Sequence, residues 1–341
     1  MHVFDMVNNM DLFMEMLKTD STSSRERGFS EFLKKRLPDG RCTVESFEVG
    51  DGTENLLFSW GKPEIFFCTH LDTVPPYFPP VHSGGVMRGR GACDAKGQIF
   101  SMYNACLALA DEGQEGFALL LLAGEETGSF GAKNFRTVHP GGKYVIVGEP
   151  TDNCMVSASK GTKSYRVTIK GKSSHSGYPE YGLSAVELFV DFVNRLRLAD
   201  LPSDPELGKT TYNIGMLESA NPQNVLSESL SFRLYFRTTF ASDGVVQSLM
   251  ERLGDNSYIE IEPFGGDTPS RYVTLDGFDT KTVAFGSDAP QLTNFENRIL
   301  CGPGSILAAH TLSEYVLMED IEKATDNYVK MFRILKTGKR S

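Results

Sequence analysis

Four short apolar runs of the sequence are each followed by side chains that could bind a metal or move a proton. They are His70 and Asp72 after 65–69, Glu125 and Glu126 after 117–123, Glu149 after 144–147, and His310 beyond 299–301. Such runs are typical of strands buried on both faces of a sheet. In an open α/β sheet the carboxyl ends of the strands meet where ligands bind, so we expect these side chains to gather at one edge.

Asp94 adds a further carboxylate from a different kind of element. It follows the glycine-rich stretch 84–93 and precedes a helix expected over 96–111, so a helix N-cap is the alternative to a ligand. A single histidine at a strand end is likewise often structural. Two histidines and three carboxylates together, however, form the ligand set of a two-zinc hydrolytic site in which one ligand bridges the ions.

Two further roles follow from the spacing of these residues. Side chains two apart on an extended chain point the same way, so the carboxylate of Asp72 should reach the far ring nitrogen of His70 and fix its tautomer. Glu125 and Glu126 are adjacent and cannot both face one metal pair with good geometry. One of them should therefore bind metal while the other acts as a base in amide hydrolysis.

Composition limits the class of protein. A chain of 341 residues with 40% hydrophobic residues favours two domains with packed cores. The net charge of −10, spread along the chain, predicts no positively charged surface for nucleic acid, and no apolar run is long enough for a membrane span. An amphipathic helix over 1–19 in place of a signal peptide, and six scattered cysteines, predict a cytoplasmic protein with free thiols.

The expected elements change character near residue 160. Strands and helices alternate before it, which predicts a mainly parallel sheet flanked by helices, including a helix over 24–37 opened by a Ser23 and Glu26 capping box. Residues 161–265 follow the order βαββαβ, which is the ferredoxin-like plan. We therefore expect a catalytic domain of 1–160 and 266–341 with a ferredoxin-like α+β domain inserted at 161–265.

Five ordered motifs resemble those of one family, the co-catalytic zinc metallopeptidase family 20. They are 69–75, 89–97, 123–128, 148–151 and 173–177. The resemblance implies a zinc-peptidase-like catalytic domain with two divalent ions, Zn²⁺ or Co²⁺. It also implies the following roles: His70 and Glu149 on one ion, Glu126 and His310 on the other, Asp94 bridging, Asp72 orienting His70, and Glu125 as general base and acid.

For the inserted domain, the resemblance implies a lid that also forms a homodimer. His175 would then reach the scissile carbonyl from the partner subunit, and Asn224 would lie near the same substrate group. The glycine-rich turn with Gly302, Gly304 and Ser305 could offer backbone N–H groups to an α-carboxylate, or could be only a tight turn. The family's Asp-x-Arg on the strand 230–238 is missing its acid here, which leaves the role of Arg237 open.

The C-terminal stretch is most similar to the acetylornithine deacetylase group. The resemblance thus implies an amidohydrolase that removes an acyl group from an N-acyl-L-amino acid, N-acetyl-L-ornithine or N-acetyl-L-citrulline, in arginine biosynthesis. Succinyl-diaminopimelate desuccinylase, acetyl-lysine deacetylase and dipeptidase are alternatives with the same metal residues. A metal-stabilised dimeric scaffold without activity is the alternative outside enzymes.

Overall fold

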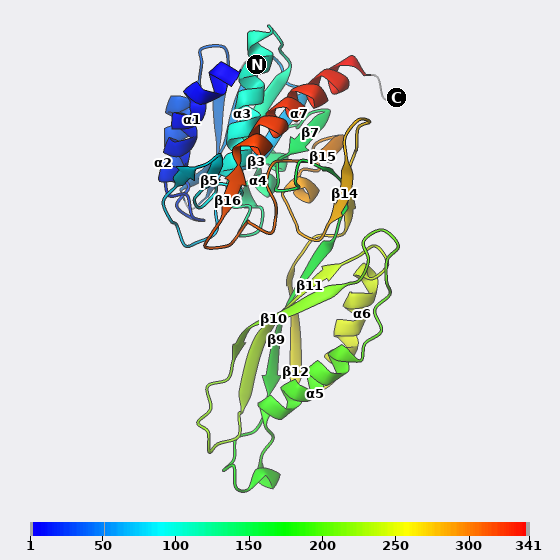
Figure 1. Cartoon of the computed structure of the whole chain (residues 1–341). Helices are drawn as coiled ribbons and strands as arrows, with labels where there is room; N and C mark the ends of the chain where they lie inside the picture. The colour runs from blue at the N-terminus through cyan, green and yellow to red at the C-terminus, as the bar shows by residue number, and fades with distance from the viewer. Residues whose placement is uncertain (1–2, 51, 339–341) are drawn as a thin grey trace. The chain divides into compact units, whose positions relative to one another are not determined.

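The structure is a computed structural model that describes residues 3–50 and 52–338 (Figure 1). Contacts between residues divide the chain into two compact units. Unit 1 comprises Met1–Ser157, Tyr272–Lys281 and Ser287–Ser341, and unit 2 comprises Ala158–Arg271 and Thr282–Gly286. The predicted insert, 161–265, lies inside unit 2. Within the described ranges, no helix combines the length and the apolar character needed to cross a membrane.

A six-stranded sheet forms the centre of unit 1. In spatial order its strands are β1 (Thr43–Gly50), β2 (Thr53–Trp60), β6 (Phe117–Leu122), β3 (Ile65–His70), β7 (Tyr144–Val147) and β15 (Asn297–Leu300). The last four run parallel to one another, and β1 and β2 are antiparallel additions at one edge. This confirms the predicted mainly parallel α/β sheet, and it brings the carboxyl ends of β6, β3, β7 and β15 to one edge.

The apolar runs are continuous because helices cover both faces of this sheet. All residues of β3 are buried. The ring of Phe67 packs against Tyr328 of α7 (Met318–Thr337) at a centroid distance of 5.8 Å, while Phe66 on the opposite face packs against Phe295 at 4.9 Å. The remaining helices of unit 1 are α1 (Val3–Lys18), α2 (Arg27–Arg36), α3 (Lys96–Asp111) and α4 (Phe130–Val138).

The start of α2 differs from the prediction. This helix begins at Arg27, its N-cap residue is Glu26, and no side chain caps it. The capping box was wrong because Ser24 has left-handed backbone, with φ of 73°, and the hydroxyl of Ser23 donates a hydrogen bond to Asp72 instead. Ser23 therefore serves the sheet edge rather than the helix.

Unit 2 contains a four-stranded antiparallel sheet with two helices packed on it. Its elements follow the chain as β9 (Gly161–Lys170), α5 (Ala185–Arg197), β10 (Thr211–Glu218), β11 (Ser229–Thr238), α6 (Asp243–Leu253) and β12 (Ile259–Gly265). The spatial order is β10-β11-β9-β12, so the predicted ferredoxin-like plan is confirmed. Buried and accessible residues alternate along β11, as expected for a sheet with one face on a core.

Short strands complete the chain. One small sheet of unit 1 has the order β16 (Tyr315–Leu317), β5 (Val86–Arg88), β4 (Val81–Ser83). A separate small sheet, made of segments at the boundaries of the two units in the sequence, has the order β13 (Ser270–Arg271), β8 (Met155–Ser159), β14 (Thr280–Val283). The first of these sheets matters for the site, because β5 and β16 lie next to the segments that carry Asp94 and His310.

Candidate metal centre

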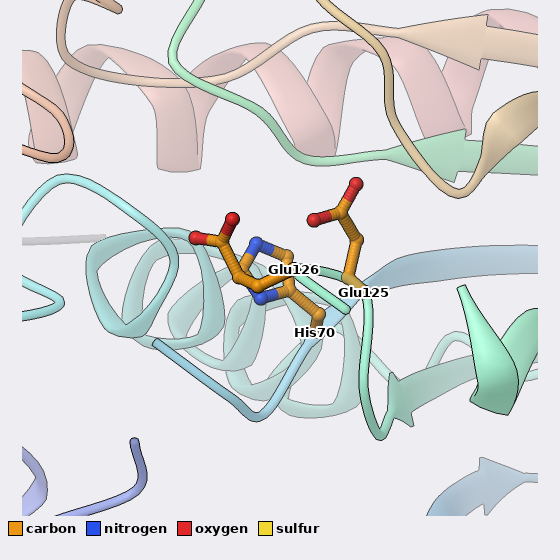
Figure 2. A group of neighbouring side chains, drawn as sticks. All are labelled: His70, Glu125 and Glu126. Carbon is orange, nitrogen blue, oxygen red and sulfur yellow. The ribbon is translucent and has the colours of Figure 1, made fainter. Parts of the chain in front are cut away.

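Parallel strands bring the predicted ligands to one edge of the unit 1 sheet. His70 is the last residue of β3, Glu125 and Glu126 follow β6, and Glu149 follows β7. Figure 2 shows His70, Glu125 and Glu126 lying side by side, with the two carboxylates extending from adjacent positions of one loop. His310 comes from the loop after β15, and Asp94 stands just before α3.

The ligand atoms form three overlapping groups, within each of which they lie no more than 4.8 Å apart. The groups are His70 with Asp94 and Glu149, Asp94 with Glu126 and His310, and His70 with Glu125 and Glu126. Asp94 is the member shared by the His70–Glu149 group and the Glu126–His310 group, so its position suits a ligand that bridges two ions. The structure thus brings all five proposed ligands and Glu125 together, and that they hold metal ions stays a prediction.

Contacts within the cluster are short and join histidines to carboxylates. Oδ1 of Asp94 lies 2.9 Å from Nε2 of His70, and Oδ2 lies 3.4 Å from Nε2 of His310. Nε2 of His310 is also 2.8 Å from Oε1 of Glu126. Asp94, His70 and Glu149 are buried, whereas His310 is exposed. The cluster therefore has a buried side and an open side through which a substrate could approach.

The carboxylate of Asp72 reaches the far ring nitrogen of His70, as predicted, but it also has closer partners. Nδ1 of His70 lies 2.9 Å from the backbone carbonyl oxygen of Asp72, and 3.4 Å from its carboxylate. The carboxylate also accepts hydrogen bonds from the backbone N–H groups of Glu125 and Glu126, at 3.0 and 3.2 Å, and from Ser23 Oγ at 2.9 Å. Asp72 therefore orients His70 chiefly through its main chain, and its side chain holds the loop of the two glutamates.

Burial and charge shift the pKa values in the cluster. Burial raises the pKa of Glu125 well above its usual range, with the carboxylates of Asp288 and Glu126 adding to the effect. Burial likewise raises the pKa of Glu149. Hydrogen bonds to Asp94 and Glu126 raise the pKa of His310 to about 10. Carboxylates crowd this site, and a cation would relieve that crowding.

The glycine-rich turn is tied into the fold. The N–H group of Gly302 donates to Thr151 Oγ1 at 2.9 Å, so this donor already has a partner within the chain, and its contact with a substrate carboxylate stays a prediction. A Cβ on Gly304 would lie 2.6 Å from the Cys93 sulfur, and the φ of Gly304 is +76°. Both glycines are buried, and Ser305 is partly accessible. The tight-turn interpretation accounts for the two glycines.

The residues proposed for unit 2 lie close to each other. His175 forms a β-bridge with Val225, and the N–H group of Ser176 donates to the carbonyl of Asn224 at 2.9 Å. The N–H group of Gly177 donates to Nδ1 of His175 at 3.1 Å. Since Nδ1 accepts this bond, the neutral imidazole carries its proton on Nε2. Both His175 and Asn224 are exposed.

Arg237 lies in the same unit, on β11. Its guanidinium lies 4.9 Å from the centre of the Tyr235 ring, which occupies the position of the missing acid. A cation–aromatic contact therefore replaces the expected carboxylate neighbour.

Some residues of the site were not found from the sequence. Ser23 bonds to Asp72 from 49 positions earlier in the chain, and the buried pair of Arg90 and Glu314 lies behind Asp94. No local pattern marks these partners, although Glu314 stands four positions after His310. Only the folded chain brings them together.

The mainly parallel sheet with histidines and carboxylates at its edge, together with the ferredoxin-like insert, defines a metallopeptidase fold. The model of peptidase family M20/M25/M40 matches residues 66–333. The chain therefore belongs to this family, whose members are hydrolases that depend on two metal ions.

Individual relatives agree with this assignment. A peptidase M20 domain-containing protein of Schizosaccharomyces pombe is 32% identical over 337 residues, which cover 95% of this chain and 84% of that protein. A probable carboxypeptidase of Emericella nidulans is 32% identical over 373 residues, covering 94% and 88%. The crystal structure of a Staphylococcus aureus tripeptidase superimposes with a TM-score of 0.81 at 16% identity, covering 95% and 97%.

The residues at the sheet edge fit a pair of divalent ions. Imidazole and carboxylate groups are the donors that Zn²⁺ and similar ions accept. Glu149 is 4% exposed, and its Oε1 has no hydrogen-bond partner among the described residues. A buried carboxylate oxygen of this kind is costly unless it is paired or binds a cation. The donor set therefore suits the ions on which the family depends.

Proposed function

We propose that the protein is a two-metal amidohydrolase that cleaves a linear amide bond next to an amino acid, in short peptides or N-acyl amino acids. The observation that carries the proposal is the joint presence of five proposed ligands and a sixth residue, Glu125, whose carboxylate lies in the same cluster. A scaffold without activity would have no use for this sixth group. Family membership supports hydrolysis as the reaction class.

The ligand roles are those expected from the sequence. His70 and Glu149 would hold one ion, Glu126 and His310 the other, and Asp94 would bridge them, which agrees with the overlap of the groups at Asp94. When bound, such ions polarise the scissile carbonyl and make water more acidic at neutral pH. Zn²⁺ is the ion that we propose, with Co²⁺ as a working substitute.

Glu125 would move the proton. It lies in the same loop as Glu126, and the hydrogen bond from its N–H group to Asp72 fixes the main chain at this point. Its carboxylate would take the proton from the attacking water and deliver it to the nitrogen of the departing amine.

His175 would stabilise the developing oxyanion. Its Nε2 carries the proton in the neutral form, because Nδ1 accepts from Gly177, so it could donate a hydrogen bond to a negatively charged oxygen. We propose that it acts on the site of the partner subunit in a homodimer formed through unit 2, with Asn224 beside it. The family resemblance is the support for this part of the proposal.

Two substrate classes are in competition. The relative from Emericella nidulans is named a probable carboxypeptidase, and the Staphylococcus aureus structure is that of a tripeptidase, which favours short peptides with a free C-terminus. The resemblance of the segments 283–290 and 301–310 to acetylornithine deacetylases favours N-acetyl-L-ornithine or N-acetyl-L-citrulline. We place the short-peptide class first, because the relatives match nearly the whole chain.

Product analysis can decide between these classes. The purified protein would be incubated with Zn²⁺ or Co²⁺ and a panel of dipeptides, tripeptides, acyl-capped dipeptides and N-acetyl or N-succinyl amino acids, with a chelator control. Release of free C-terminal amino acids supports the peptidase, and release of acetate supports the deacetylase. Stoichiometric metal binding without cleavage of any compound would contradict the enzyme proposal in favour of a binding scaffold.

A further inference from the structure

Behind the candidate metal centre lies a buried ion pair that the proposed reaction does not use. We propose that Glu314 and Arg90 form a positioning pair, which holds Asp94 and His310 in place and thereby sets the affinity of the centre for divalent ions. This inference rests on the metal-binding part of the proposed function. Neither residue is a proposed ligand.

Glu314 links directly to the backbone that carries Asp94. Its side chain is completely buried, at 0% exposure, and its Oε1 accepts hydrogen bonds from the N–H groups of Cys93 and Asp94, both at 3.0 Å. Because these bonds fix the peptide groups on the N-terminal side of Asp94, they restrict the direction of its side chain. That side chain meets His70 and His310.

Arg90 completes the pair on the other side of the carboxylate. Its Nη1 lies 2.5 Å from Oε2 of Glu314, its Nε donates to the carbonyl of Pro76 at 3.1 Å, and its guanidinium lies 5.0 Å from the centre of the Phe78 ring. Arg90 is 1% exposed. A charge this deeply buried needs a partner, so the two side chains constrain each other.

The same carboxylate is only four residues from His310. The N–H group of Gly89 donates to the carbonyl of Glu314 at 3.1 Å, and Tyr315 pairs with Arg88 in the small sheet. His310 itself has a φ of 61°, a left-handed conformation that a residue other than glycine keeps only when its surroundings impose it. The anchor at Glu314 provides such a constraint next to a proposed ligand.

The pair requires a carboxylate rather than an amide at position 314. Oε1 accepts from two backbone N–H groups, and Oε2 accepts from a guanidinium, so both oxygens act as acceptors. Glutamine has one acceptor oxygen and one amino group, and can therefore satisfy only one of these sides. Glu314→Gln should disturb the anchor with little change in volume.

The test compares metal affinity with stability. Affinities for Zn²⁺ would be measured by competition with a chromophoric chelator, and the Co²⁺ form would be examined by visible absorption. The thermal midpoint in chelator reports the fold alone. We expect Glu314→Gln to lower the affinity for at least one of the two ions by about 10–100-fold and to change the Co²⁺ spectrum. Loss of residues that hydrogen-bond to metal ligands has effects of this size in other proteins.

Glu54→Gln is the matched control. Glu54 is also buried, at 1% exposure, and its carboxylate pairs with Lys34 at 2.8 Å, but none of the proposed ligands is among its ion-pair partners. This variant should lower the thermal midpoint while its ion affinities stay within about twofold of the wild type, since the charge lost is not linked to the ligands.

Each outcome decides the proposal. If the wild type binds two ions and Glu314→Gln binds them equally well, the positioning role is overturned while the proposed function stands. A wild type that binds no divalent ion overturns both. If Glu314→Gln does not fold, Glu314→Asp decides. It keeps the charge on a shorter side chain that cannot meet both partners, so it should weaken binding in the same direction, and unchanged affinity would overturn the proposal.

Discussion

Glu125 and Glu126 are neighbours in sequence, yet we propose different roles for them because their surroundings differ. Glu126 contacts His310 at 2.8 Å and belongs to two of the ligand groups, whereas Glu125 belongs only to the group with His70. A carboxylate that shares fewer ligand contacts is better placed to carry a proton. The difference between these two adjacent residues is therefore the sharpest test of the mechanism.

Replacing each glutamate by glutamine should separate the two roles. Glu125→Gln should keep both ions and lower kcat by about 10²–10⁴-fold, because a positioned acid or base contributes that much. Glu126→Gln should lose affinity for one ion. Elemental analysis after dialysis and steady-state kinetics measure the two effects. Near-normal turnover of Glu125→Gln would remove this residue from the mechanism.

The raised pKa of His310 predicts how the affinity for metal ions depends on pH. Hydrogen bonds to Asp94 and Glu126 raise its pKa from 6.5 to about 10, so in the metal-free protein it is protonated at pH 7. A histidine ligand must be neutral, so binding of an ion releases this proton. The apparent affinity should therefore rise with pH until the pH reaches about 10, by up to about tenfold per unit for each proton released.

The same shift has a consequence for the metal-free protein. Because the folded state holds the proton more tightly than the unfolded state does, His310 stabilises the fold below pH 6.5, and this contribution is lost as the pH rises toward about 10. Thermal midpoints in chelator from pH 6 to 10 would show the decline. His310→Gln serves as the control, and it should show a smaller decline over this range.

The positions of site residues could be predicted from the sequence only where these residues follow the ends of strands. His70, Glu149 and the two glutamates follow apolar runs, and parallel pairing was enough to expect them together. The carboxylate of Asp72 lies 3.4 Å from Nδ1 of His70, as expected, but its closer partners, the N–H groups of the next loop, were not expected. Ser23 and Glu314 were missed because their partners are distant in sequence.

At the scale of elements, the start of α3 is held tightly against the loop before it. A Cβ on Gly97 would lie 2.3 Å from the carbonyl oxygen of Ala92, which belongs to the backbone and cannot rotate away. This close approach keeps the helix next to Asp94. The absence of a side chain at Gly97 therefore helps to position Asp94.

Two glycine-to-alanine changes in helices should therefore have opposite effects. Gly97→Ala should destabilise the protein by more than about 1 kcal/mol despite the helix preference of alanine, since the helix must move. Gly244→Ala in α6, where a Cβ would meet nothing within 4 Å, should stabilise it by about 0.4–1 kcal/mol. Chemical denaturation measures both. A stabilised Gly97→Ala variant would contradict the close packing seen here.

The order of elements was predictable because each type has its own period in the sequence. Uninterrupted apolar runs indicated the strands of the parallel sheet, and alternation over 164–170 indicated the first strand of the unit 2 sheet. The helix start at Ser23 was wrong because a capping pattern is local, whereas the hydroxyl of Ser23 bonds to a residue 49 positions away. Contacts that compete with local patterns become visible only in the folded chain.

At the scale of the whole molecule, the residues proposed for catalysis come from both units. The proposed ligands and Glu125 belong to unit 1, and His175 and Asn224 belong to unit 2. If His175 acts on the partner subunit, the two halves of one complete site come from different chains. A change at Glu125 would then damage the unit 1 part of a catalytic site, and a change at His175 would damage the unit 2 part of the partner's site.

Mixing these two variants tests this division. Glu125→Gln and His175→Ala homodimers should each be nearly inactive, and His175→Ala should lower kcat about 10²–10³-fold, as loss of an oxyanion donor does. After subunit exchange, half of the dimers are mixed, and each mixed dimer has one site with Glu125 and the partner's His175 both intact. Activity should therefore return to about a quarter of the wild-type value for a twofold-symmetric dimer. If His175 instead serves the site of its own chain, every site in a mixed dimer of these two variants carries one of the two changes, and no activity should return. In that case, a wild-type chain paired with a chain that carries both changes should still have one active site per dimer.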